Sequence, residues 1–463
     1  MSPIKAAMSP IKTAMRAHIM HKRLLNTLGA VSLALSAHIV VAQDTAAELQ
    51  ALSQEVALMQ QEVGQLEAEN EIENLQRIFG FYFDKNLWTE VADLFTEDAT
   101  VELGGSGVYA GKAHILAYFQ SFGAEGPQPG ILNDQMQLQP VLTVNSNGTA
   151  KGRWHLFSQE AVHGVSHHWG SGIYENEYRF EDGVWKISKV HLYSTMRTPY
   201  EDGWGVTALP RTTPSEELPP DMPASVEYEN YPAVYVPPFH YTNPGVPVRN
   251  VVGTVAESMT VEQLSTALNT LDRRVGLLQD ADDVERLHTI YGYYLQRNQW
   301  DHLTGIFTPD GTIEIAQRGV YRGAVSIRRN LDLYGVQDEL PGTLHNHMQY
   351  QPVIHIAADG QSALMRSRAF SMMGNYSGTG RWMGGIYENI FEKRNGVWML
   401  HKDQQINTYF ASFDEGWKDM VQRPPPGITA ANPPDEPPSL VFDMYPSAYL
   451  PAFHYANPVT GRQ

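Results

Sequence analysis

The stretch "WGSGIYENEY" from Trp169 to Tyr178 recurs as "WMGGIYENIF" from Trp382 to Phe391. Alternating residue character in both copies predicts a β-strand. Because side chains along a strand point to opposite faces in turn, Tyr174 and Tyr387 are expected to face inward, each on the same side as the glycine two residues earlier. The glutamates that follow these tyrosines are expected on the outer surface or at a seam between domains. The sequence therefore contains one strand of its fold twice.

The repeat extends over most of the chain. A displacement of 212 residues aligns the amino-terminal part of each copy, 213 aligns the strands, and 214 aligns the two Pro-rich tails. This period is far longer than the roughly 20 to 50 residues of a solenoid unit, so we predict two tandem domains. The predicted divisions are a domain over 47–204, a strap over 205–259, a domain over 260–417 and a strap over 418–463.

Each copy has helices first and strands afterwards. Leucine and valine recur at helical spacing from Leu49 to Leu66, and an aromatic helix follows up to Phe83. Later segments alternate with a period of two and are separated by turns such as Asn147-Gly148, which predicts a strongly curved antiparallel sheet. The fold class is therefore α+β. The helical arms that precede the two domains are expected to pack the halves together.

The amino-terminal region, 1–42, has the pattern of an export signal. His21, Lys22 and Arg23 precede an apolar run that ends in a cleavage-like triplet, and Met20 is the predicted true start. A membrane anchor is the alternative, although the run is short of the ~20 apolar residues that a span needs. No later stretch is apolar enough to cross a bilayer, so we predict a periplasmic or secreted protein without a membrane span after signal removal.

Composition restricts the chemistry. The formal net charge of −18 argues against a nucleic-acid partner, which would require clustered basic residues. The chain has no cysteine, which excludes disulfides, thiolate metal sites and cysteine nucleophiles. Any reaction must use His, Asp, Glu, Tyr, Arg or Ser.

The motifs "LFTEDATVE", "GVYAGKAHI", "GIYENEY" and "DGVWKIS" together resemble the SnoaL-like branch of the nuclear-transport-factor-2-like superfamily. The resemblance implies two cone-shaped α+β barrels, each with a bent sheet around a helix and an apolar pocket. Relatives include small-molecule cyclases, scytalone dehydratase, ketosteroid isomerase and limonene-epoxide hydrolase, and also members without catalysis. Since single-domain relatives often pair between chains, the resemblance implies a monomer with an internal pseudo-dimer.

The same resemblance divides a catalytic pair between the copies. Asp84 lies where scytalone-dehydratase-like proteins place an aspartate that orients the catalytic histidine, whereas the second copy has Gln296. His347 lies where they place that histidine, whereas the first copy has Gln135. Each half therefore holds one member of the pair.

Other residues complete two competing catalytic sets. In the second half, His347 would be the general base or acid, Tyr387 would polarise a substrate oxygen, and Tyr294 would help to position it. In the first half, Asp84, Tyr174, His155 and His191 form the alternative set. The competing interpretation of the inward tyrosines is that they are core residues whose hydroxyls find internal partners.

Substrate contacts are assigned to four further residues: Trp88, Trp300, Arg368 and Asp403. Arg368 would bind an anionic or phenolate group, unless it is simply a solvent-facing strand residue. The fragment "HHW" from His167 to Trp169 has no third ligand at a suitable spacing, so no metal is predicted. No cofactor is expected either.

The repeated tails, with Phe239-His240-Tyr241 and Phe453-His454-Tyr455, are predicted to dock on the barrels as extended straps. They would either close a pocket mouth or cover a sheet surface. Two functional classes follow from the whole sequence. One is an exported, cofactor-free lyase, dehydratase or isomerase that acts on a moderately apolar, oxygenated small molecule with or without an aromatic ring. The other is a binding protein that holds such a molecule unchanged.

Overall fold

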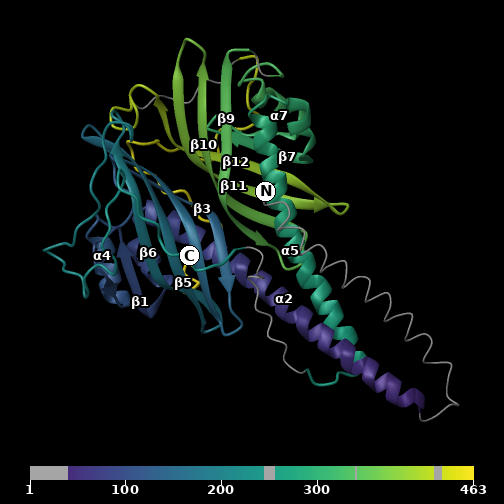
Figure 1. The fold of residues 1–463 in the computed structure, drawn as a ribbon. Helices are drawn as coiled ribbons and strands as arrows, with labels where there is room; N and C mark the ends of the chain where they lie inside the picture. The colour runs from purple at the N-terminus through teal and green to yellow at the C-terminus, as the bar shows by residue number, and fades with distance from the viewer. Residues whose placement is uncertain (1–39, 244–255, 339–340, 422–429) are drawn as a thin grey trace.

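The computed structural model describes residues 40–243, 256–338, 341–421 and 430–463. The predicted signal region lies almost entirely outside these residues. Figure 1 shows two repeated α+β units, each with a long amino-terminal helix and a curved sheet. The predicted fold class is confirmed. Within the described residues, no helix combines the length and apolar character that crossing a bilayer requires.

The first unit follows the predicted order of elements. Its helices and strands are α2 (Val40–Asp84), α3 (Trp88–Asp93), β1 (Phe95–Leu103), β2 (Tyr109–Ala110), α4 (Lys112–Gln120), β3 (Ile131–Val144), β4 (Thr149–Val162), β5 (Ser166–Glu181) and β6 (Val184–Pro199). The end of α2 is apolar on most sides because the sheet curls around it, and Phe79 and Phe83 join one core with Val101 and Tyr174.

The second unit repeats this order. Its helices and strands are α5 (Val261–Leu295), α6 (Trp300–Gly305), β7 (Phe307–Ile315), β8 (Tyr321–Arg322), α7 (Gly323–Leu331), β9 (Thr343–Ile356), β10 (Ser362–Asn375), β11 (Gly380–Arg394) and β12 (Val397–Ser412). A capping box at Thr260 and Gln263 starts α5.

Each unit has a six-stranded sheet, in the orders β2-β1-β6-β5-β4-β3 and β8-β7-β12-β11-β10-β9. The four long strands are antiparallel as predicted, but β1 runs parallel to β6, and β7 runs parallel to β12. The sheet is therefore mixed rather than purely antiparallel. Bulges at Gln139 on β3 and Gln351 on β9, both with positive φ, interrupt the register at equivalent places. Such bulges bend strands and help to form the cone.

The repeated Gly-Ile-Tyr-Glu-Asn stretch forms β5 and β11. A Cβ on Gly172 would lie 2.8 Å from the carbonyl oxygen of Tyr193, and one on Gly385 would lie 2.6 Å from that of Ile406. The glycines are thus required because the adjacent strand approaches closely at a register shift, and not simply to leave space inside the cone. The inward orientation of Tyr174 and Tyr387 is confirmed, since both are buried core residues.

The two units share an extensive seam. The amino-terminal parts of α2 and α5 extend together beyond the sheets (Figure 1) and bury Val56, Val63, Leu264 and Leu271 between them. The predicted packing of the arms is confirmed. Equivalent elements contact each other elsewhere too, including β3 with β9, and Trp169 with Trp382 at a ring separation of 5.8 Å. Contact between equivalent surfaces is the pattern of an isologous dimer, here within one chain.

The straps dock on the outer faces of the barrels. His240 Nδ1 lies 2.9 Å from Glu175 Oε2, and His454 Nδ1 lies 2.9 Å from Glu388 Oε2. The outward glutamates of the repeated stretch therefore anchor the straps. The second strap continues onto the first unit, where Phe453 packs on Tyr82 with ring centroids 5.1 Å apart. It joins the halves as well as covering its own barrel.

Candidate functional site

The second barrel encloses a cavity of about 350 Å³. Its wall is formed by the open end of the sheet, the end of α5, the turn after β7 and the second strap. The second strap closes one side of the cavity with Phe442 and Met444. The polar groups on the wall are Gln317, Arg318, Tyr334, His345, His347, Arg381, Gln405 and Asn407.

His347 is the most firmly held ionisable group on this wall. It lies on β9, where the strand alternation points its side chain into the barrel, and it is only 4% exposed. Its Nδ1 is 2.6 Å from Ser371 Oγ, and its Nε2 is 2.7 Å from Tyr387 Oη. Both ring nitrogens therefore have neutral partners, which fixes the orientation of the ring.

Burial keeps this imidazole uncharged. The pKa of His347 is well below its ordinary value, first because of burial and then because of the nearby His345 and His288. A neutral imidazole retains one nitrogen lone pair, so His347 can accept a proton at ordinary working pH.

Tyr387 lies behind His347 rather than on the cavity wall. It is fully buried, and its hydroxyl also lies 3.4 Å from Gln405 Oε1. Burial, with Asp403 adding to it, raises the pKa of Tyr387 well above its usual range, so the phenol stays protonated. Tyr387 therefore holds His347 in place from behind. Of the hydrogen-bonded residues His347, Tyr387 and Gln405, Tyr387 alone is absent from the cavity wall, and Gln405 connects it to the cavity.

Asp403 forms a second polar layer beneath the cavity wall. Its Oδ2 accepts a hydrogen bond of 3.0 Å from Tyr291, and its Oδ1 accepts one of 2.9 Å from Asn389. Burial raises the pKa of this carboxyl to about 7, and these hydrogen bonds oppose the rise. The residue predicted to bind substrate therefore supports the core of the barrel instead of lining the cavity.

Tyr294 and the two predicted substrate-contact tryptophans also lie away from the cavity wall. Tyr294 stacks on His302 with ring centroids 5.3 Å apart. Trp88 and Trp300 are buried, and their indole nitrogens donate to the carbonyl oxygens of Gly123 and Gly335 at 2.9 and 3.0 Å. The tryptophans fix the loops after α4 and α7.

The alternative set in the first half is dispersed over separate partners. His155 Nε2 is 3.2 Å from Ser171 Oγ. His191 stacks on Tyr193 with centroids 3.9 Å apart, and burial lowers its pKa to about 4. Tyr174 packs edge-on against Phe79 at 6.5 Å. No hydrogen bond among the described residues joins the four members of this set to one another.

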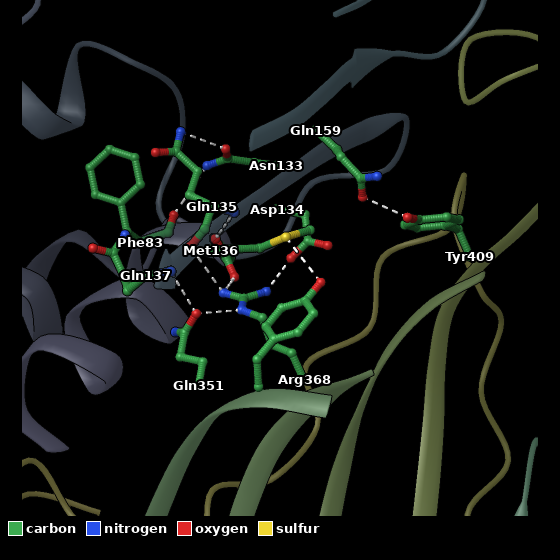
Figure 2. Close-up of polar contacts among 12 residues, drawn as sticks. Phe83, Asn133, Asp134, Gln135, Met136, Gln137, Gln159, Gln351, Arg368 and Tyr409 are labelled. Atoms are coloured by element: carbon green, nitrogen blue, oxygen red, sulfur yellow. Dashed lines mark hydrogen bonds and ion pairs between the residues drawn. The ribbon is translucent and has the colours of Figure 1, made fainter. Parts of the chain in front are cut away.

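Asp84, the fourth member, is part of the seam. Figure 2 shows the guanidinium of Arg368, which comes from β10 of the other half, among the polar groups of β3. Arg368 forms ion pairs with Asp84 and Asp134, and its Nε donates to Gln351 Oε1 at 2.8 Å. The backbone nitrogen of Gln135 donates to Asp84 Oδ1 at 2.7 Å.

This network has the character of a buried structural ion pair. Burial raises the pKa of Asp84, and the guanidinium opposes that rise, while the two carboxylates raise the pKa of Arg368. Arg368 is thus neither solvent-facing nor on the cavity wall. Asp84, which the resemblance implied to be a catalytic residue, thus forms an ion pair between the two halves.

The sequence-based prediction did not include Gln405 and Arg318, which line the cavity, or Ser371, which holds His347 from behind the wall. Ser371 has a serine, Ser158, at the equivalent position of the first half, so a comparison of the copies does not single it out. Gln405 replaces Leu192, and this difference between the copies could have indicated it. Arg318 lies in the turn between β7 and β8, where no periodic pattern indicates the direction of a side chain. A comparison of the two copies would have found it, because its first-half equivalent is Ser106.

The geometry of both halves agrees with a known domain. Residues 64–191 and 277–402, more than half of the chain, match the SnoaL-like domain. The chain belongs to the SnoaL-like family. This SnoaL-like protein contains the domain in two copies, as the resemblance implied.

Similar solved structures each cover about a third of this chain. A putative scytalone dehydratase from Novosphingobium aromaticivorans is 20% identical, with 33% of this chain and 95% of that chain covered and a TM-score of 0.27. A hexachlorocyclohexane dehydrochlorinase, LinA type 2, is 20% identical over 33% and 99%, with a TM-score of 0.27. LinA type 3 from Novosphingobium barchaimii is 16% identical over 30% and 92%, with a TM-score of 0.26. No curated protein sequence matches the chain.

Proposed function

We propose that the second barrel of this SnoaL-like protein is a cofactor-free lyase of the dehydratase type, or an isomerase, that acts on a moderately apolar, oxygenated small molecule with or without an aromatic ring. The observation that carries the proposal is His347: a neutral imidazole on the wall of a cavity, with both ring nitrogens held in place. A positioned base with an available lone pair is the main requirement for moving a proton on a bound substrate.

The proposed reaction begins when the imidazole ring of His347 turns from Tyr387, whose hydroxyl then donates only to Gln405, and presents Nε2 to the cavity. The imidazole then takes a proton from a substrate carbon. In a dehydration, the electron pair of the broken C–H bond forms a C=C bond, the neighbouring C–O bond breaks, and the imidazolium returns its proton to the leaving hydroxide as water. In an isomerisation, the proton returns to a different carbon.

The apolar part of the wall suits such a molecule. Met373, Met383 and Phe410 line the cavity beside the polar groups. A wall of this kind excludes water from the reacting atoms and leaves the orientation of the substrate to a few polar contacts.

A binding protein without catalysis is the second candidate. Gln296 replaces the aspartate that orients the histidine in scytalone-dehydratase-like relatives, and an amide cannot stabilise an imidazolium as a carboxylate does. On this alternative, His347 and Gln405 would only hydrogen bond to a retained ligand.

Deuterium exchange separates the two candidates. Small molecules that copurify with the protein are first identified by mass spectrometry and then returned to the protein in D₂O. The enzyme proposal expects deuterium in the recovered substrate or product with wild-type protein, and loss of this incorporation with His347→Gln. Binding without exchange in the wild type would favour the binding protein.

We also propose that the protein is exported and acts as a monomer, with a small molecule as its partner. The internal seam supports the monomer, because it already buries the surface that equivalent halves share. Amino-terminal sequencing of the mature protein, together with its mass in solution, tests both points. Retention of residues 1–42, or a stable dimer, would contradict them.

A further inference from the structure

Arg318 is a buried cation fixed at the edge of the second cavity. It follows β7 in a turn where Ala316 and Gln317 both have positive φ. The strap holds this turn, since Gln317 Nε2 donates to Phe442 O at 2.8 Å and the backbone nitrogen of Phe442 donates to Gln317 Oε1 at 3.0 Å. The side chain of Arg318 is 6% exposed and lines the cavity. Its position is therefore set before any ligand enters.

The charge of this arginine has no counterpart among the described residues. Its Nε and Nη1 are buried without a hydrogen-bond partner, and none of the ion pairs in the described part of the chain includes it. Its guanidinium lies over the ring of Tyr334, with Cζ 4.2 Å from the centroid. Burial raises the pKa of this phenol and Arg318 opposes the rise, so Tyr334 remains neutral and supplies no negative charge.

Two other buried arginines of the same half, unlike Arg318, form ion pairs. Arg366 forms an ion pair with Glu388, and Arg368 forms ion pairs with Asp84 and Asp134. Burying a charge is costly unless it is paired and hydrogen bonded, and proteins normally provide the partner, as they do for these two. An unpaired arginine at a cavity wall is the exception, and its missing partner can be a ligand.

The first barrel has no such cation at the equivalent position. Ser106 takes the place of Arg318, and its hydroxyl forms hydrogen bonds of 3.3 Å within its own turn, with Leu103 and Gly107. The arginine is therefore found in the half that also has His347 on its cavity wall.

We propose that Arg318 binds the carboxylate of an apolar small molecule, whose body lies against Met373, Met383 and Phe410 and within reach of His347. A guanidinium suits this role because it always carries its charge and offers several donors to a carboxylate. The cavity volume of about 350 Å³ is at the small end of ligand sites. The inference deepens the proposed function by naming a substrate class, and it depends on that function only for the claim that the bound carboxylate reacts.

The test compares carboxylates with uncharged molecules of the same shape. Cinnamate, 2-naphthoate and octanoate, with their primary amides, are titrated into the full-length protein by calorimetry. We expect at least one of the carboxylates to bind about tenfold or more tightly than its amide, the range of a charge-assisted hydrogen bond in a protected site. Arg318→Gln should abolish this preference.

Two control variants separate the possible explanations. Arg381→Gln removes the other, exposed arginine of the cavity wall and should leave the preference unchanged. His347→Gln should also retain it, because the carboxylate contact does not involve the imidazole. Arg318→Gln should unfold at a temperature no lower than the wild type without ligand, since it removes an unpaired buried charge.

Equal affinity for every carboxylate and its amide, including no binding of either, would overturn the inference. A preference that survives in Arg318→Gln would also overturn it. If carboxylates bind through Arg318 while no proton exchange occurs in the wild type, the carboxylate site stands and the lyase proposal fails. If the wild type exchanges deuterium into an uncharged substrate but not into any carboxylate, the lyase or isomerase proposal stands and the carboxylate site fails.

Discussion

The two halves have one fold, but their polar residues serve different purposes. In the first half, Asp84 and Asp134 are used by the seam through Arg368, and the position equivalent to His347 is Gln135. In the second half, His347 faces a cavity, and Arg318 at its edge has no ion-pair partner in the part of the chain that the structure describes. The difference shows how a duplicated fold can divide its work: one copy supplies structural contacts, and the other keeps ionisable groups on a cavity wall.

The largest expected effect comes from breaking the seam. Arg368→Ala leaves the buried carboxylate of Asp84 and the partly buried one of Asp134 without their cation, which should cost about 3–5 kcal/mol of unfolding free energy. His155→Ala changes the equivalent strand position of the first half, where the side chain is half-buried and hydrogen bonds to Ser171, and should cost about 1 kcal/mol. Denaturant unfolding of the two variants measures the difference. Equal losses of unfolding free energy would show that the Arg368 network stabilises the protein no more than the single hydrogen bond of His155.

The next comparison uses pH. Burial lowers the pKa of His288 to about 3 from an ordinary 6.5, and its first-half equivalent is Gln76, which does not titrate. As pH falls below 6.5, the unfolded chain binds a proton at this position while the folded chain does not, so the unfolding free energy decreases until about pH 3. The slope from one such group is at most about 1.4 kcal/mol per pH unit.

His288→Gln makes the second half resemble the first at this position. Its unfolding free energy should fall less steeply than that of the wild type between pH 6 and pH 4, by about the slope of one proton. Denaturant midpoints across this pH range give the result. Parallel curves for both proteins would mean that His288 is protonated in the folded state.

A smaller effect is expected behind the cavity wall. Ser371→Ala removes the partner of His347 Nδ1, so we expect kcat to fall about fivefold with KM nearly unchanged, because a single hydrogen bond is worth about 1 kcal/mol. Ser158→Ala makes the same change at the equivalent position, where the hydroxyl bonds to Glu160, and should leave kcat unaltered. A loss confined to KM would assign Ser371 to substrate binding instead of positioning.

The smallest difference concerns the strap anchors. Glu388 pairs with Arg366, whose side chain is 1% exposed, whereas Glu175 pairs with Arg153, which is 13% exposed. Glu388→Gln should therefore cost about 1 kcal/mol more than Glu175→Gln, because water screens the second pair better. Thermal unfolding of the two variants ranks them. The reverse order would indicate that the first strap is the more tightly anchored one.

The fold could be predicted from the sequence because both copies have the same order of helical and strand patterns. The strand alternation alone placed Tyr174 and Tyr387 inward and their neighbouring glutamates outward, as the structure confirms. The parallel pairing of β1 with β6 was not predicted, because β1 is separated in sequence from the strand beside it and carries no signal of its direction.

The site was harder to predict than the fold. The pairing of His347 with Tyr387 brings together two residues that the sequence had already selected. The contact of Arg368 with Asp84 spans the two halves, so no pattern within one copy could indicate it. Arg318 lies in a turn, where side-chain direction depends on left-handed backbone angles and on the strap that holds them.

Turnover by one matched pair of variants tests the central claim most directly. With an identified substrate, His347→Gln should lose about a hundredfold or more in kcat, the usual contribution of a general base, while Asp84→Asn should retain turnover close to that of the wild type wherever it remains folded. The claim that the second half carries the reaction would be contradicted by the opposite result: turnover that persists in His347→Gln and disappears in a folded Asp84→Asn protein.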